Sequence, residues 1–185
     1  MTSLHDDLER IASAARALVG PREELAAVIP AEPAAERRVY LCAFVDERGA
    51  RTWLLLDDDG DPVGDRGLVR DAVSIAAMCE LAEEVAGGGK LDELRTRLAE
   101  LRRTEQPEGI GEAEDALEAL ARVVAQRPRS ATPAYLDRLG AAARRLEVAL
   151  GDDADSPFAA ALTASLPSVE ELSRDVEAHY RLALA

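Results

Sequence analysis

The sequence predicts a mainly α-helical fold: an irregular multi-helix bundle with a small antiparallel β-hairpin, of two to three strands, packed near a buried central helix. Over most of the chain, apolar residues recur at steps of three and four, which is the period of a helix face. Two short apolar runs between residues 38 and 57 flank a stretch of turn residues, a pattern that predicts a hairpin. The stretch 68–86 is apolar nearly all round over almost two turns, which is typical of a helix buried on several sides.

The N-terminal part is predicted to form two helices and a linker. The apolar period predicts a helix over 3–19, with one face made of Leu4, Leu8, Ile11, Ala15 and Leu18. Gly20-Pro21 ends this helix and opens a short one over 22–29, whose apolar side carries Leu25, Val28 and Ile29. Pro30 and Pro33 break the short helix, so the stretch up to Arg37 is expected to be a linker.

The hairpin is predicted over 38–57. Its strands are the apolar runs 39–45 and 52–56, and residues 46–50 have the composition of a turn. A second turn at 58–61 leads to a very short third strand at Pro62-Val63. Both main strands are apolar on both faces, so we expect helices or another subunit to cover both sides of the sheet.

The rest of the chain is predicted to be helical, and all of it to belong to one domain, 1–185. The expected helices cover 68–86, 90–103, 111–126, 133–150, 157–165 and 169–183. Glycines at 87–89 and 151 supply helix ends, and Ser156-Pro157 supplies a helix start. Ser168 and Glu171 have the spacing of a capping box for the last helix.

Composition limits the class of partner. The formal net charge is -14, which disfavours nucleic acids and anionic membranes, because both require a basic surface. No apolar run has the length of a membrane span and no signal peptide is visible, so we expect a soluble, cytoplasmic protein. Lys90 is the only lysine among many arginines, a bias typical of GC-rich bacterial genomes. Cys42 and Cys79 lie in apolar runs and are expected to be buried, reduced thiols.

One acidic stretch and one glycine-rich stretch resemble ligand-binding loops, but neither matches the residue spacing that such a loop requires. The run 57–61 has clustered carboxylates and Gly60, but the calcium-loop register would place Leu55 and Arg66 at ligand positions, so a solvated turn is expected. The glycines before Lys90 lack the spacing of a phosphate-binding loop. His5 and His179 are expected at the surface.

Carboxylates on two predicted helices could bind a metal. Glu80 and Glu83 share one helical face, and Glu112 and Asp115 share another. If these helices faced each other, the two pairs could hold Mg²⁺ against a triphosphate. The pattern resembles the motif of the all-α nucleoside-triphosphate pyrophosphohydrolases, which have Glu-Glu-x-x-Glu on one helix and Glu-x-x-Asp on another. The resemblance covers only these positions, and Cys79 replaces the first Glu of the motif.

Two aromatic residues of the hairpin, Tyr40 and Trp53, could line an interface or a pocket, with core packing as the other use. The two-faced hairpin and the Ala-rich helices favour a non-enzymatic interaction or scaffold domain, with a homodimer as one form and no cofactor. Two alternatives stay open: an Mg²⁺-dependent pyrophosphohydrolase-like enzyme that uses the four carboxylates, and a small-ligand sensor with Trp53 in the wall of its pocket.

Overall fold

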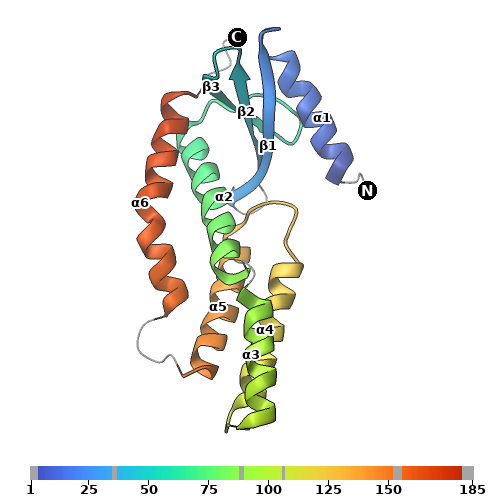
Figure 1. Ribbon diagram of the computed structural model, residues 1–185. Coiled ribbons are helices and arrows are strands. Elements are labelled where there is room, and N and C mark those ends of the chain that lie inside the picture. The colour runs from blue at the N-terminus through green and yellow to red at the C-terminus, as the bar shows by residue number, and fades with distance from the viewer. Residues whose placement is uncertain (1–3, 35–36, 88–89, 106, 152–155, 181–185) are drawn as a thin grey trace. The chain divides into compact units, whose positions relative to one another are not determined.

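Figure 1 shows the computed structural model, which describes residues 4–34, 37–87, 90–105, 107–151 and 156–180. The chain divides into two compact units, which we call the sheet unit (1–77, 129–133 and 168–185) and the helical unit (78–128 and 134–167). Two helices, α2 (Arg66–Gly87) and α6 (Pro157–Ala178), each contribute residues to both units. The single domain expected from the sequence stays a prediction.

The sheet unit contains one antiparallel sheet of three strands in the order β1-β2-β3. It is built from α1 (Leu4–Ala17), β1 (Glu23–Ala34), β2 (Arg37–Asp46) and β3 (Arg51–Asp57), together with the first part of α2 and the last part of α6. Helices make up most of the rest of the described chain, so the predicted fold class, mainly α with a small antiparallel sheet, is confirmed.

The segment expected to be a helix over 22–29 and a linker up to Arg37 is instead the long strand β1, so both predictions are wrong. A β-bulge between Leu25 and Ala27 inserts one extra residue opposite β2. The bulge explains why the apolar spacing of Leu25, Val28 and Ile29 fits a helix and is nevertheless compatible with a strand. Pairing with β2 decides between the two, because β-branched residues pack well in a half-buried strand.

The third strand is therefore β1, which precedes the hairpin, rather than the expected strand at Pro62-Val63. That segment makes only a single bridge, between Pro62 and Leu56, and the Val63 N–H donates to Leu55 O at 2.8 Å. The hairpin lies where the sequence places it, with Leu41 opposite Leu55 and Ala43 opposite Trp53.

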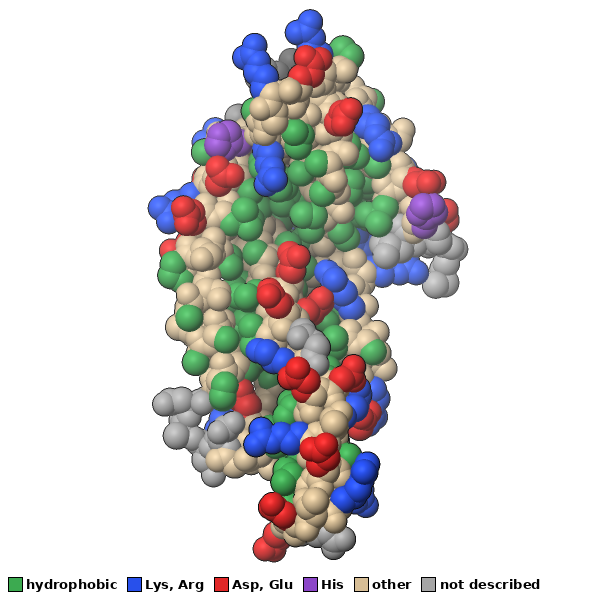
Figure 2. Space-filling view, in the orientation of Figure 1, with side chains coloured by type: hydrophobic (Ala, Val, Ile, Leu, Met, Phe, Trp, Pro, Cys, Tyr) green, Lys and Arg blue, Asp and Glu red, His purple; other side chains and the backbone are tan. Residues whose placement is uncertain are grey.

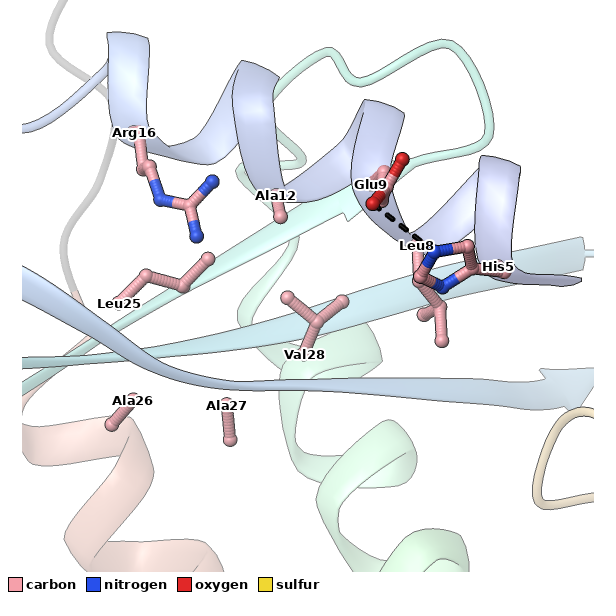
Figure 3. A pocket seen from close by; sticks show the side chains of 9 residues that line it. All are labelled: His5, Leu8, Glu9, Ala12, Arg16, Leu25, Ala26, Ala27 and Val28. Carbon is pink, nitrogen blue, oxygen red and sulfur yellow. Dashed lines mark ion pairs between the residues drawn. The ribbon is translucent and has the colours of Figure 1, made fainter.

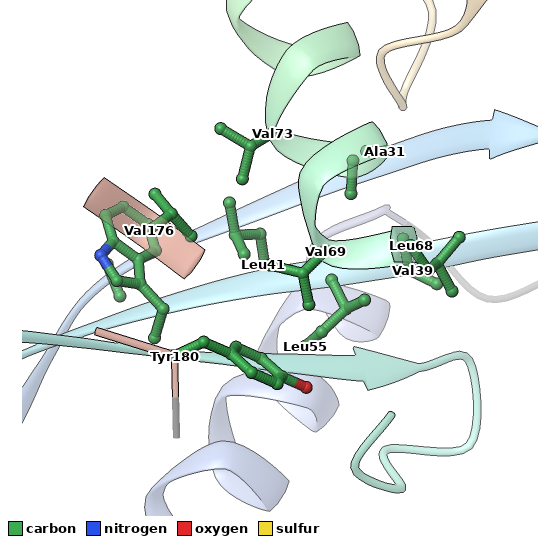
Figure 4. Packing of buried hydrophobic residues seen from close by; sticks show 12 residues of the cluster. Ala31, Val39, Leu41, Leu55, Leu68, Val69, Val73, Val176 and Tyr180 are labelled. Atoms are coloured by element: carbon green, nitrogen blue, oxygen red, sulfur yellow. The ribbon is translucent and has the colours of Figure 1, made fainter. Parts of the chain in front are cut away.

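Both faces of the sheet are covered by helices of the same unit, as the apolar pattern predicts. On one face, Ile11 and Ala15 of α1 pack on a cluster of strand residues made of Tyr40, Cys42, Phe44, Leu54 and Leu56. On the other face, shown in Figure 4, α2 and α6 pack on the alternate residues, and the cluster includes Val39, Leu41, Leu55, Leu68, Val69, Val73, Val176 and Tyr180. The central helix thus buries its first turns against the sheet.

The helical unit contains α3 (Lys90–Thr104), α4 (Ile110–Ala125) and nearly all of α5 (Pro133–Ala149), with the remaining parts of α2 and α6. Ion pairs link Arg95 to Glu118 at 2.8 Å and Arg102 to Glu114 at 2.9 Å. The residue number of the α4 partner falls as the residue number on α3 rises, so the two helices are antiparallel. Their short connection agrees with this arrangement.

The last helix is continuous where the sequence predicts two helices, over 157–165 and 169–183. α6 begins at Pro157, and Ser156 acts as its N-cap by accepting the Ala159 N–H at 3.1 Å. Pro167 lies inside the helix, so the expected capping box of Ser168 and Glu171 is not a helix start. A proline removes only its own N–H, and neighbouring turns can preserve the helix on both sides of it. The predicted stretch 181–183 lies outside the described residues.

Glu147 of α5 is a buried carboxylate that fixes the start of α6. It is 8% exposed and accepts hydrogen bonds from the Ser156 hydroxyl at 2.5 Å and the Phe158 N–H at 2.7 Å. We expect Glu147→Ala to lower the free energy of unfolding by about 2 kcal/mol, because it leaves two donors without their acceptor. Urea denaturation measures the loss. The matched control is Val148→Ala at a 49% exposed position, and an equal loss in both variants would contradict the capping role.

Candidate interaction site

The four candidate metal ligands lie on α2 and α4 within the helical unit. Glu80 is exposed, as are Glu112 and Asp115 in the first turns of α4. Glu83 is half-buried and forms an ion pair of 3.1 Å with Arg127, just beyond the end of α4. The four side chains therefore differ in environment, and Glu83 already has a cationic partner.

The structure does not bring the two carboxylate pairs together. The end of α2 packs against the last turn of α4, since a Cβ on Gly87 would lie 3.3 Å from Val124 Cγ1. Glu112 lies about 18 Å from that point along the axis of α4. Within the described ranges, no group of three or more His, Cys, Asp or Glu side chains could hold a metal ion. The geometry therefore lends no support to the magnesium site.

The Glu83 carboxylate has a second neighbour, the buried hydroxyl of Tyr135. Burial is the main cause that raises the pKa of Tyr135 from 10.0 to about 12, and the neighbouring Glu83 carboxylate is the next. Both effects favour the neutral phenol, because a phenolate would be poorly solvated and close to another anion. This cluster of Glu83, Arg127 and Tyr135 has a structural role inside the helical unit.

The raised pKa predicts how stability depends on pH. The unfolded chain loses the Tyr135 proton near pH 10, whereas the folded chain holds it until about pH 12. The contribution of Tyr135 to stability is therefore complete below pH 10 and is lost as the pH rises toward 12. We expect the stability of Tyr135→Phe to fall less steeply over this window than that of the wild type, as measured by urea denaturation at several pH values. Parallel pH profiles would contradict the assignment.

Tyr40 and Trp53, the candidate interface or pocket residues, are core residues of the sheet unit. Tyr40 is 1% exposed and its hydroxyl donates to Asp58 Oδ1 at 3.0 Å. Trp53 is 9% exposed, lies in the cluster on the α2 face, and its backbone N–H donates to His179 O at 3.2 Å. Both side chains take part in the core packing of the sheet unit, and a role for either residue in an interface or a pocket stays a prediction.

The remaining candidates have local roles. Asp57 Oδ1 accepts the N–H groups of Asp59 at 3.0 Å and Asp61 at 2.9 Å, so the acidic run forms a tight turn. His5 and His179 are exposed; His5 pairs with Glu9 on α1, and His179, directly after α6, pairs with Asp175. Burial raises the pKa of Cys42 to about 12, which keeps its thiol protonated and unreactive.

The feature that the sequence did not predict is an open strand edge. β1 is at one end of the sheet, and its outer side is paired near Ala31, where Ala131 N–H donates to Pro30 O and Glu32 N–H donates to Ala131 O. Between Glu24 and Ile29, no residue in the described part of the chain pairs with this outer side. The opposite edge differs, because segments near Val63 and His179 bond to β3.

The outward backbone groups of this edge belong to two apolar residues. Both backbone groups of a strand residue point to the same side, and the side alternates along the strand. The bonds at Pro30 O and Glu32 N–H fix the alternation, which also explains why a proline is tolerated at position 30. Val28 therefore presents its N–H and C=O outward. The bulge adds one residue to β1 between Leu25, which lies opposite Phe44, and Ala27, which lies opposite Ala43. The alternation shifts by one residue there, so Leu25 also presents its N–H and C=O outward.

A groove runs along this edge between β1 and α1, with a volume of about 510 Å³. Figure 3 shows its two walls: Leu25 and Val28 point from β1 toward α1, and Leu8, Ala12 and Arg16 lie on the facing side of the helix. The exposed ion pair of His5 and Glu9, 3.1 Å long, marks one end of the groove. The side chains that line it and the outward backbone groups thus come from the same strand residues.

The other side of β1 is apolar as well. Ala27, Ile29 and Ile75 are partly buried and pack against the cluster on the α2 face. Figure 2 shows hydrophobic side chains gathered in the upper half of the visible face, where Figure 1 places β1 and the first part of α2. β1 is therefore half-exposed on both faces over 27–29 and open along its outer edge.

No protein-family model, curated protein or solved structure matches this chain. Every helix of the described chain is too short or too polar to cross a lipid bilayer. The sequence reasoning missed the β1 edge because it assigned the segment to a helix. The β-branched pair Val28-Ile29 directly before Pro30 is the signal that could have indicated an edge strand.

Proposed function

We propose that this protein is a non-enzymatic interaction domain that binds a protein partner, or a copy of itself, through the open edge of β1. One observation carries the proposal: Leu25 and Val28 point their backbone N–H and C=O groups outward, and the side chains of the same two residues form an apolar groove with α1. An added strand gains affinity from main-chain hydrogen bonds and specificity from the pockets that receive its alternate side chains.

Burial of the apolar surface supports the same proposal. Leu25, Ala27, Val28 and Ile29 are all partly exposed, and a strand laid against them would remove apolar area from water. Each square ångström of apolar surface so buried contributes about 25 cal/mol of favourable free energy before the costs of association. Natural proteins usually block such an edge with charges, prolines or bulges; within 24–29 the one charge is Glu24, and one bulge lies between Leu25 and Ala27.

Site-specific photo-crosslinking tests the proposal. A photoreactive amino acid at Ala26, which is exposed within the open stretch, is expected to form crosslinks to a protein in cells, either another copy or a different chain. The matched control places the same group at Ala141, which is exposed on α5 in the helical unit. If crosslinks from position 26 do not exceed those from position 141, the β1 edge is not the site of interaction.

A further inference from the structure

We propose that the partner at the β1 edge is an extended segment of another protein, apolar over most of its length, with one acidic side chain that pairs with Arg16 in the groove. The inference rests on the proposed function and adds the chemistry of the partner. Three features of the sheet unit specify this segment: the extent of the open edge, the direction of the β1 side chains and a cation above the groove.

The first feature is the extent of the open edge. The Glu23 N–H and Pro30 O are already hydrogen-bonded within the sheet unit, each at 3.2 Å. The open stretch is therefore 24–29, which has the length of an ordinary strand. A segment that is extended along this stretch can bond to Leu25 and Val28, whose N–H and C=O groups point outward.

The second feature is the direction of the β1 side chains. Leu25 and Val28 point toward α1 and line the groove, whereas Ala27 and Ile29 pack on the α2 face. Residues that lie opposite each other in neighbouring strands point their side chains to the same face of the sheet. The partner residues opposite Leu25 and Val28 therefore enter the groove, and the side chains between them meet apolar surface on the other face.

The third feature is a cation above the groove. Figure 3 shows the Arg16 guanidinium over the interval between Leu25 and Val28. Ala12 and Leu8 lie farther along α1, on the Val28 side of the groove. The cation thus lies over the middle of the open stretch, and the apolar part of the helix faces the Val28 side.

The groove lacks a counter-charge for this cation. The Arg16 side chain forms no ion pair or hydrogen bond with any residue that the structure describes. Among the described residues that line the groove, Glu9 is the only carboxylate, and it pairs with His5 at 3.1 Å. A strand laid over the groove removes water from the guanidinium, and a cation that loses water without a counter-charge is costly. An occupant that supplies a carboxylate at this point offsets that cost.

These features define the side chains of the partner segment. The residue opposite Leu25 is acidic, because a carboxylate there lies under Arg16, and the residue opposite Val28 is apolar, because it faces the apolar part of α1. A carboxylate can accept two parallel hydrogen bonds from a guanidinium, which adds specificity to the charge attraction. With a net charge of -14, the chain repels strongly acidic segments, so a single acidic residue among apolar ones fits best.

A library of random peptides displayed on phage tests this chemistry. Selection on the wild type is expected to enrich peptides that have apolar residues at alternate positions and one Asp or Glu among them. Selection on Arg16→Glu should lose the preference for an acidic residue and favour Lys or Arg in its place. Arg10→Glu makes the same change in net charge at an exposed position outside the groove lining. This matched control should select the same acidic peptides as the wild type.

Charge exchange with one selected peptide measures the pairing. Arg16→Glu is expected to raise the dissociation constant of the most frequent wild-type peptide about tenfold. The same peptide with Lys in place of its acidic residue should recover most of this loss on the variant. Peptide binding should slow the exchange of the Leu25 and Val28 amides with deuterium, and Val28→Pro, which removes an outward N–H, should abolish binding in a folded chain.

Each failure has a separate meaning. Selected peptides without an acidic preference, or with the same preference on Arg16→Glu, overturn the pairing, and binding that Val28→Pro leaves unchanged overturns the surface. If no peptide is selected, or if crosslinks from position 26 join only copies of this chain, the inferred partner is wrong. Crosslinks from position 26 that exceed those of the control leave the proposed function standing in all of these cases, so its failure can be told apart from the failure of this inference.

Discussion

Ile29→Pro is expected to destabilise the sheet unit by about 3 kcal/mol or more, whereas Val28→Pro leaves the fold intact. The N–H of Ile29 points toward β2, opposite Leu41, so a proline there removes a hydrogen bond of the ladder and leaves a buried acceptor without a donor. Val28 points its N–H away from the sheet, on the same side as the backbone nitrogen of Pro30, which carries no hydrogen. The two substitutions are chemically the same and lie one residue apart.

Urea denaturation followed by the fluorescence of Trp53, the single tryptophan, measures both variants. Its indole lies in the cluster between the sheet and α2, so its signal reports on the sheet unit. The comparison also tests the assignment of β1, because a helix over 22–29 would be broken by proline at either position. Equal destabilisation by the two prolines would therefore contradict the strand.

Phe44→Ala is expected to lower the free energy of unfolding by about 3–5 kcal/mol. Phe44 is 0% exposed, lies between Leu25 and Thr52 of the neighbouring strands, and belongs to the cluster under α1. Aromatic residues are scarce, at 3% of the chain, and the cluster contains only two, so the remaining small and aliphatic side chains cannot close a cavity of this size. The loss combines the lost transfer of the ring from water with the cost of the cavity.

The matched control is Leu18→Ala, since Leu18 follows α1 directly and is 43% exposed. We expect this change to alter the free energy of unfolding by less than about 0.5 kcal/mol. Urea denaturation and the midpoint of thermal unfolding serve as readouts. If both variants lost the same stability, the packing of α1 on this face of the sheet would not contribute as the structure indicates.

Helices and strands with a clear apolar period, or with a clear capping residue, were predictable because these sequence signals lie within the element itself. The helices near 68–86, 90–103, 111–126 and 133–150 lie close to α2, α3, α4 and α5, and the hairpin over 38–57 corresponds to β2 and β3. Apolar residues on both faces of the hairpin predicted helices on both sides, which α1 and α2 provide. These predictions used only the spacing of side chains along each element.

The last helix failed for the opposite reason. Pro167 and Ser168 form a sound local signal for a helix end and a new start, and α6 passes through both. The sequence correctly predicted the start at Ser156-Pro157, because the Ser156 hydroxyl caps the helix through a bond to a residue three positions away. The sequence did not indicate the second cap of this helix, the carboxylate of Glu147. This residue belongs to α5, and its role depends on how α5 and α6 pack.

By itself, the sequence determined the class of the fold, the hairpin and most of the helices. It also offered core packing as one of two possible roles for Tyr40 and Trp53. Tertiary structure alone decided that 23–34 is a strand, because only pairing with β2 and the bulge at Ala26 reconcile its apolar spacing with alternation. It also decided the candidate site. Whether carboxylates on α2 and α4 meet, and whether the edge of β1 is covered, depends on contacts between distant residues, which no local pattern contains.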